Sequence, residues 1–169
     1  MQRPNKNEYA SYYETYISKV PEGNILDLLR QQVNAMQSYV QNIPEEKGLF
    51  KYAPDKWTIK EVLGHINDGE RIFGYRALRF SRNDKNQLPG FEQDDFVKES
   101  NFNEIKLADM LDEFVKLREA NIATFKNFSE AMWTRRGVAS KNEMSVRAVP
   151  YIIYGHVQHH LNVLQEKYL

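Results

Sequence analysis

Three histidines in two distant segments have the residue type and the spacing that can bind one metal ion. His156 and His160 lie four residues apart in YGHVQHHLNVL, and His65 lies in LGHINDGE. An i, i+4 pair lies on one face of a helix, about 5–6 Å apart at Cβ, so both imidazoles can reach one ion. If the two segments pack together, three protein ligands leave a fourth coordination position for water or substrate. The pattern predicts a metal site that can do chemistry.

The apolar residues around these histidines indicate which of them face the interior. His156 and His160 lie on or beside a helical stripe. The stripe consists of Val149, Ile153, Val157, Leu161, Leu164 and Tyr168. His159 is an alternative ligand, but a helical wheel places it at the edge of the stripe, so we rank it below His160. His65 flanks the stripe of its own segment, and Gly69, one turn later, is expected to leave space beside the site.

The predicted elements are helices, which indicates an all-α fold. Four long amphipathic segments are expected at about 24–43, 58–80, 103–128 and 150–168, with a short aromatic-faced helix at 9–17. Thr58 and Glu61 form a capping box at the start of the second long helix. No run alternates as a strand would. We therefore predict a four-helix bundle with a short extra N-terminal helix, in which the long connections 81–101 and 129–144 are crossovers, lids or binding loops.

Composition bounds the domain organisation and the partners. A chain of 169 residues is the size of a single domain, 1–169. It has 23 basic and 23 acidic residues, so no nucleic-acid partner is expected. The absence of cysteine excludes disulfides, thiolate ligands and a cysteine nucleophile. No signal peptide and no apolar run of about 20 residues is found, so we expect a cytoplasmic protein without a membrane partner.

Buried charge on the helices has two interpretations. Arg118 lies within the apolar stripe of the third long helix, where an unpaired charge is costly, so it needs a carboxylate partner such as Glu70 or an anionic ligand. Glu70 is either a surface ion-pair residue or a group that orients a metal-binding imidazole. Asn121 is either a core hydrogen-bonding residue or a substrate contact. Glu70 and Arg118 are therefore candidate catalytic residues.

The long connection 81–101 contains further candidate functional residues. Asp94 and Asp95 could deliver a general base or a fourth metal ligand. Phe91 and Phe96, together with Trp57 before the second long helix, are either packing anchors or walls of a substrate pocket. For Trp57 the packing interpretation is favoured.

Four segments of the chain resemble a known family. KYAPDKWTIKEVLGHINDGERIF, LPGFEQDDFV, LREANIATF and YIIYGHVQHHLNVLQEKYL resemble successive motifs of the DinB-like superfamily, particularly its YfiT-type metal-dependent hydrolases. The likeness extends from about Ile25 to the C-terminus. Its most specific part is the combination of Trp57, Gly64-His65 and Glu70-Arg71 with the paired histidines about ninety residues later.

The resemblance implies a fold, an ion and two kinds of activity. It implies a four-helix bundle with a divalent ion, usually zinc or nickel, at positions that correspond to His65, His156 and His160. It also implies hydrolysis of a small-molecule substrate, or transfer to a low-molecular-weight thiol such as bacillithiol, mycothiol or glutathione, and a homodimer. The alternative is a non-catalytic helical bundle, a binding or stress-response protein that binds a small molecule or partner, with a structural or vacant metal site.

Overall fold

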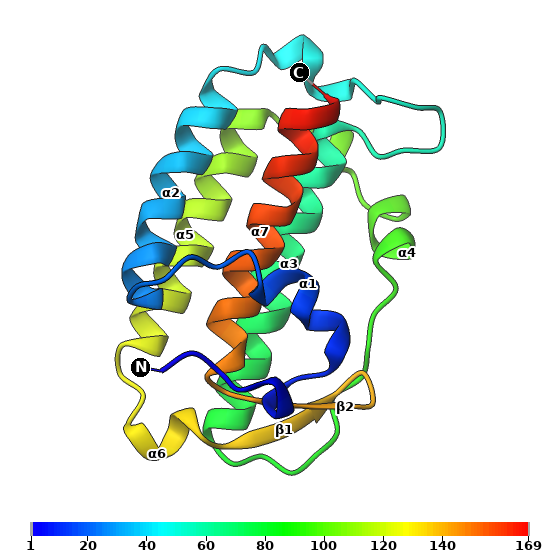
Figure 1. The fold of residues 1–169 in the computed structure, drawn as a ribbon. Coiled ribbons are helices and arrows are strands. Elements are labelled where there is room, and N and C mark those ends of the chain that lie inside the picture. Colours follow the sequence, from blue (N-terminus) through cyan, green and yellow to red (C-terminus); the bar gives the residue numbers. More distant parts are fainter. Residues whose placement is uncertain (1, 169) are drawn as a thin grey trace.

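The computed structural model describes residues 2–168, and helices dominate it. The four long helices are α2 (Ile25–Gln41), α3 (Ile59–Ser81), α5 (Leu107–Phe125) and α7 (Ala148–Lys167) (Figure 1). The short helices are α1 (Glu14–Ile17), α4 (Gln93–Lys98) and α6 (Glu130–Trp133), and 3-10 turns lie at Lys6–Glu8, Ser11–Tyr13, Glu45–Leu49 and Phe102–Glu104. The predicted all-α four-helix bundle is confirmed.

The order of the helices in the bundle requires one long return of the chain. Both α2 and α3 pack against α5 and α7. In Figure 1, α2 and α7 run upward whereas α3 and α5 run downward, so α3 and its neighbour α5 are parallel. The chain between them, residues 82–106, therefore returns along the outside of the bundle and carries α4 with it. We call residues 82–106 the crossover segment.

Local capping explains where the helices start. The predicted capping box at α3 is present: Glu61 N donates to Thr58 Oγ1 (3.0 Å), and Thr58 N donates to Glu61 Oε2 (2.7 Å). The expected start of α5 near Asn103 is wrong, because the helix begins at Leu107. Asn103 instead accepts a hydrogen bond from Thr58 Oγ1 (2.7 Å), and Leu107 N is capped by Glu45 Oε2 (3.0 Å) from across the bundle.

The core consists of two apolar clusters separated by a layer of buried polar side chains. One cluster includes Leu29, Phe73, Ile122 and Ile153, and the other includes Met36, Ile66, Phe114 and Val157. Each of the four long helices contributes at least one polar residue to the layer between them. These residues include Gln32, Glu70, Arg118 and His156, all 5% exposed or less. Buried polar groups need partners, so this layer is where the contacts of individual side chains matter most.

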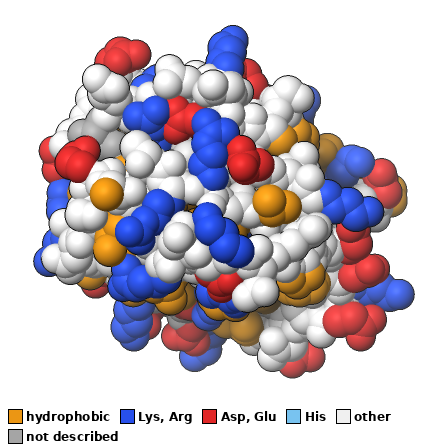
Figure 2. All heavy atoms as spheres, turned by 90° about the horizontal axis from the view of Figure 1, so that it is seen from below, with side chains coloured by type: hydrophobic (Ala, Val, Ile, Leu, Met, Phe, Trp, Pro, Cys, Tyr) orange, Lys and Arg blue, Asp and Glu red, His pale blue; other side chains and the backbone are white. Residues whose placement is uncertain are grey.

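A small β hairpin closes one end of the bundle. Strands β1 (Arg136–Ala139) and β2 (Asn142–Ser145) pair antiparallel, with Ala139 opposite Asn142. The expectation that the chain contains no strand is therefore wrong for this segment. Figure 2 shows this end of the molecule, where basic and acidic side chains lie among one another with scattered hydrophobic ones. Within residues 2–168, no helix has the length and apolar character needed to cross a membrane.

Candidate metal centre

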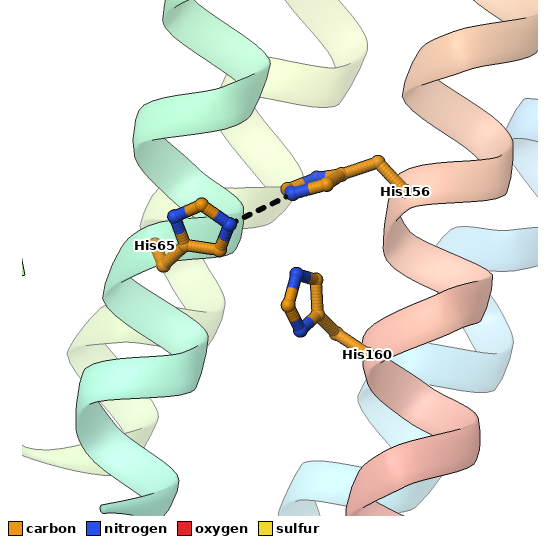
Figure 3. A group of neighbouring side chains, drawn as sticks. All are labelled: His65, His156 and His160. Carbon is orange, nitrogen blue, oxygen red and sulfur yellow. Dashed lines mark hydrogen bonds between the residues drawn. The ribbon is translucent and has the colours of Figure 1, made fainter. Parts of the chain in front are cut away.

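The structure brings His65 of α3 together with His156 and His160 of α7. One ring nitrogen of each lies within 4.8 Å of the other two. The Nε2 atoms of His65 and His156 are 2.9 Å apart, and the three pairs of ring centroids are separated by 4.7–4.8 Å. Figure 3 shows the three rings converging between the two helices. The prediction that these two distant segments pack side by side is confirmed.

The two alternative ligands His159 and His160 of α7 point in different directions. His160 points toward His65 and His156, whereas His159 lies half-buried beside Tyr16, with 5.7 Å between ring centroids. The group of converging nitrogens contains His160 and does not contain His159. Geometry thus agrees with the ranking from the helical wheel.

Gly69 lets α7 approach α3 closely at this point. A Cβ atom at Gly69 would lie 2.8 Å from Cε1 and 3.0 Å from Nδ1 of His156. The space that the sequence led us to expect beside Gly69 therefore exists, but the ring of His156 takes it up. Any side chain at position 69 would push this ring away from His65.

Burial sets the protonation of the three imidazoles. Desolvation lowers the pKa of His65 to about 4, and repulsion from His159 adds to this effect. Burial also lowers the pKa of His156 and of His160 well below the usual value, and the neighbouring imidazoles contribute in the same direction. At neutral pH all three rings are uncharged, which is the form that coordinates a metal. Three neutral, convergent imidazoles are a donor set that fits a divalent ion such as zinc or nickel.

A cavity of about 470 Å³ opens onto His65 and His156. Its walls come from the N-terminal segment, α3, the crossover segment and the β hairpin. Its lining includes Tyr13, Tyr16, Phe73, Arg76, Asp94 and Ser140. The ring of Tyr16 stands edge-on to His156, with 5.5 Å between centroids, and Trp57 lies 4.9 Å from His65. Aromatic side chains therefore shield the histidines while the cavity keeps them accessible.

Glu70 and Arg118 form the buried ion pair that the sequence suggested. Arg118 Nε donates to Glu70 Oε1 (3.0 Å), and Asn121 Nδ2 donates to Glu70 Oε2 (2.9 Å). Arg118 also donates to the Leu29 carbonyl oxygen (3.2 Å) and to Gln32 Oε1 (3.0 Å). Among the described residues, no hydrogen bond joins Glu70 to a histidine, so the expected orienting contact to an imidazole is not formed. These contacts join α2, α3 and α5 within the polar layer.

The crossover segment places Asp94, and not Asp95, near the histidines. Asp94 lines the cavity that reaches His65 and His156, and it also lines a second cavity that reaches His159 and His160. Asp95 lines neither of these. Phe91 lines the first cavity and packs against Phe96, with 5.1 Å between ring centroids, whereas Phe96 is 48% exposed.

Sequence analysis did not identify several cavity residues, among them Arg76, Tyr13 and Ser140. Arg76 lies three helical turns after His65 on the same face of α3, so the helical period could have identified it. Tyr13 belongs to the segment 9–17, for which the sequence predicts only a short aromatic-faced helix. Ser140 lies in the turn of the unpredicted hairpin, at a φ of +51°, and no pattern in the sequence marks it as a cavity residue.

Comparison with known proteins places this geometry in a family. No curated protein matches the chain. The solved structure of YfiT from Bacillus subtilis superposes with a TM-score of 0.74 at 12% sequence identity, over 90% of this chain and 95% of that one. That protein is described as a probable metal-dependent hydrolase with an unusual four-helix bundle topology, and at this identity the likeness establishes the shared fold. A family model for the DinB superfamily matches residues 28–164, and the chain therefore belongs to the DinB superfamily.

Proposed function

We propose that this protein is a metal-dependent hydrolase whose divalent ion is held by His65, His156 and His160. The observation that carries the proposal is the convergence of three neutral imidazole nitrogens within 4.8 Å at the edge of a cavity. Three protein ligands leave one coordination position, which is the arrangement of catalytic rather than structural sites. The description of YfiT as a probable metal-dependent hydrolase is consistent with this function.

The residues around the proposed ion have different roles. When bound, a divalent ion supplies a Lewis acid and acidifies a water molecule at neutral pH. Burial keeps the three imidazoles neutral, and Tyr16 and Trp57 restrict solvent around them. Asp94 is the carboxylate that lines both cavities at the site, so we assign it the role of general base. Glu70 and Arg118 form an ion pair in the core in which each neutralises the charge of the other, and we assign them a structural role.

Metal content tests the proposal directly. The wild-type protein, loaded with Zn²⁺ or Ni²⁺ and freed of excess ion, should retain one equivalent by elemental analysis. The variant with His156→Ala and His160→Ala should retain much less, because one remaining imidazole binds weakly. His159→Ala is the matched control and should retain one equivalent, because His159 lies outside the converging group.

The loaded proteins then distinguish catalysis from a structural ion. Hydrolysis of p-nitrophenyl acetate should be faster with loaded wild type than with the metal-free protein or the double variant. The assay includes a low-molecular-weight thiol, because an open position on such an ion also accepts a thiolate. Equal metal content in wild type and double variant would refute the site. One bound equivalent without any reaction on esters, amides or thiols would instead support a non-catalytic bundle.

A further inference from the structure

Arg76 is a buried positive charge that has no acidic partner within residues 2–168. Three cationic side chains are buried: Lys60 (7% exposed), Arg76 (3%) and Arg118 (0%). Lys60 pairs with Glu45 (2.6 Å), and Arg118 pairs with Glu70. None of the ion pairs formed by the described residues includes Arg76. Because an unpaired buried charge is costly, an anion from outside the chain that enters the cavity would offset this cost.

The contacts of Arg76 hold its guanidinium in place and leave donors unused. Nη2 donates to Ser140 Oγ (3.1 Å), and the guanidinium carbon lies 5.2 Å from the centroid of the Phe73 ring. The phenol of Tyr13 is buried beside it. Burial raises the pKa of Tyr13, and the Arg76 charge opposes this rise. A guanidinium has five N–H donors in a planar fork, so an oxyanion can still bind to it in a bidentate manner.

One cavity connects Arg76 to the histidines. His65, Gly69, Phe73 and Arg76 recur at helical spacing on one face of α3, and all four line the cavity. The Cα atoms of His65 and Arg76 are separated by about 16 Å along the helix axis. Long side chains on a helix lean toward its N-terminus, so Arg76 reaches back in the direction of His65. The wall between the two ends is aromatic, formed by Phe73 together with Tyr13 and Tyr16.

We propose that Arg76, with the hydroxyl groups of Ser140 and Tyr13, binds the carboxylate of an elongated substrate whose reacting group lies at the three histidines. This inference rests on the proposed function for the reacting end only. A singly charged carboxylate is favoured over a doubly charged phosphate because Glu92 and Asp94 line the same cavity, and their repulsion increases with the negative charge of the ligand. The substrate class is thus a small monocarboxylate whose two ends are separated by about seven to ten carbon–carbon bonds, since Arg76 reaches back toward His65 and shortens the span below the axial separation.

Two chelating probes of equal length test this subsite. Octanohydroxamic acid binds metal through its hydroxamate, and the monohydroxamate of octanedioic acid carries an additional terminal carboxylate. Calorimetry on the metal-loaded protein should show at least tenfold tighter binding of the carboxylate probe, because hydrogen bonds to charged groups are the stronger class. Equal affinities of the two probes for the wild-type protein would overturn the proposal.

Variants assign the preference to Arg76. Arg76→Gln should abolish the preference and leave the affinity for octanohydroxamic acid unchanged. Arg71→Gln, on the same helix but outside this cavity, should keep the full preference. If Arg76→Gln does not fold, two other variants replace it. Arg76→Lys keeps the positive charge but loses the planar set of N–H donors, and Ser140→Ala removes one hydroxyl group. Each should reduce the preference severalfold, and an unchanged preference in both would overturn the proposal.

A measurement on the metal-free protein separates this inference from the proposed function. Octanoate should shift the Nε–Hε resonance of Arg76 in the metal-free wild-type protein and should not bind Arg76→Gln. If no metal binds but this shift is observed, the proposed function fails and the carboxylate subsite stands. If metal binds, both hydroxamates bind equally and octanoate causes no shift, the subsite fails and the proposed function stands.

Discussion

At the scale of single residues, the three imidazoles make the stability of the metal-free protein depend on pH. The pKa of His65 is about 4 in the folded protein, and its ordinary value is 6.5. Between these values the unfolded chain binds a proton that the folded protein does not, so the free energy of unfolding falls as the pH falls. For His65 the loss should be on the order of 3 kcal/mol by pH 4. Chemical denaturation at several pH values measures it.

The matched variant for this prediction is His65→Asn. It removes the titrating group and should show a shallower loss of stability between pH 6.5 and pH 4. Equal slopes for wild type and variant would contradict the assigned protonation of the site. Added Zn²⁺ should stabilise the wild-type protein most above pH 6.5, because protons compete with the metal for the same nitrogens.

The buried ion pair between Glu70 and Arg118 leads to a second prediction at this scale, which concerns stability. Both side chains are essentially buried, so Glu70→Gln leaves Arg118 without its counter-charge. The free energy of unfolding should fall by about 3–5 kcal/mol, as measured by urea denaturation. Asp112→Asn breaks the exposed Lys116–Asp112 pair on α5 and should cost less than about 1 kcal/mol. A loss this small for Glu70→Gln would show that the pair is not structural.

At the scale of elements, the contact between α3 and α7 sets the geometry of the histidines. Gly69→Ala places a Cβ atom 2.8 Å from the ring of His156, so the ring must move. Metal affinity should fall at least tenfold in a competition titration. The higher helix propensity of alanine, worth about 1 kcal/mol, should offset part of the loss of stability.

Gly74 provides the comparison on the same helix. A Cβ atom at this position would lie 2.2 Å from Asn121 Oδ1 and would not meet a histidine. Gly74→Ala should therefore destabilise the fold and leave metal affinity as in wild type. If both alanine variants bind metal equally well, close approach at Gly69 does not control the site.

The same elements show what could be predicted from sequence. Helical periodicity identified the long helices and put His65, His156 and His160 on core-facing positions, because a helix repeats its face every few residues. The hairpin was not predictable in this way. Its strands have four residues each, and its turn uses Ser140 and Lys141 at positive φ, where glycine or asparagine is the usual signal. The cap of α5 by Glu45 was not predictable either, because it depends on a contact between segments that are distant in the sequence.

At the scale of the whole molecule, bundle topology determines which acidic side chains line the cavity beside the three histidines. The crossover segment returns along α3 and carries α4, whose residue Asp94 lines the cavity that reaches His65 and His156. Asp94→Asn should lower the hydrolysis of p-nitrophenyl acetate by about 10²-fold or more, because removal of a general base typically has an effect of this size.

Asp95→Asn is the control for this prediction, because its neighbour Asp94 lines the cavities and Asp95 does not. It should hydrolyse the ester at nearly the wild-type rate. Both variants should keep one equivalent of metal, since neither residue belongs to the histidine group. Similar rates for the two variants would remove Asp94 from the mechanism.

The parallel arrangement of α3 and α5 has a consequence for how such a protein can diversify. With 23 residues, α3 is about 34 Å long, and an extended chain needs roughly 10 residues to span that length. Residues 82–106 exceed this minimum more than twofold. The surplus includes Phe91 and Asp94, whereas the histidines belong to the rigid helices. Insertions and substitutions in this surplus length can change which molecules the cavity accepts, while the arrangement of the three histidines stays intact.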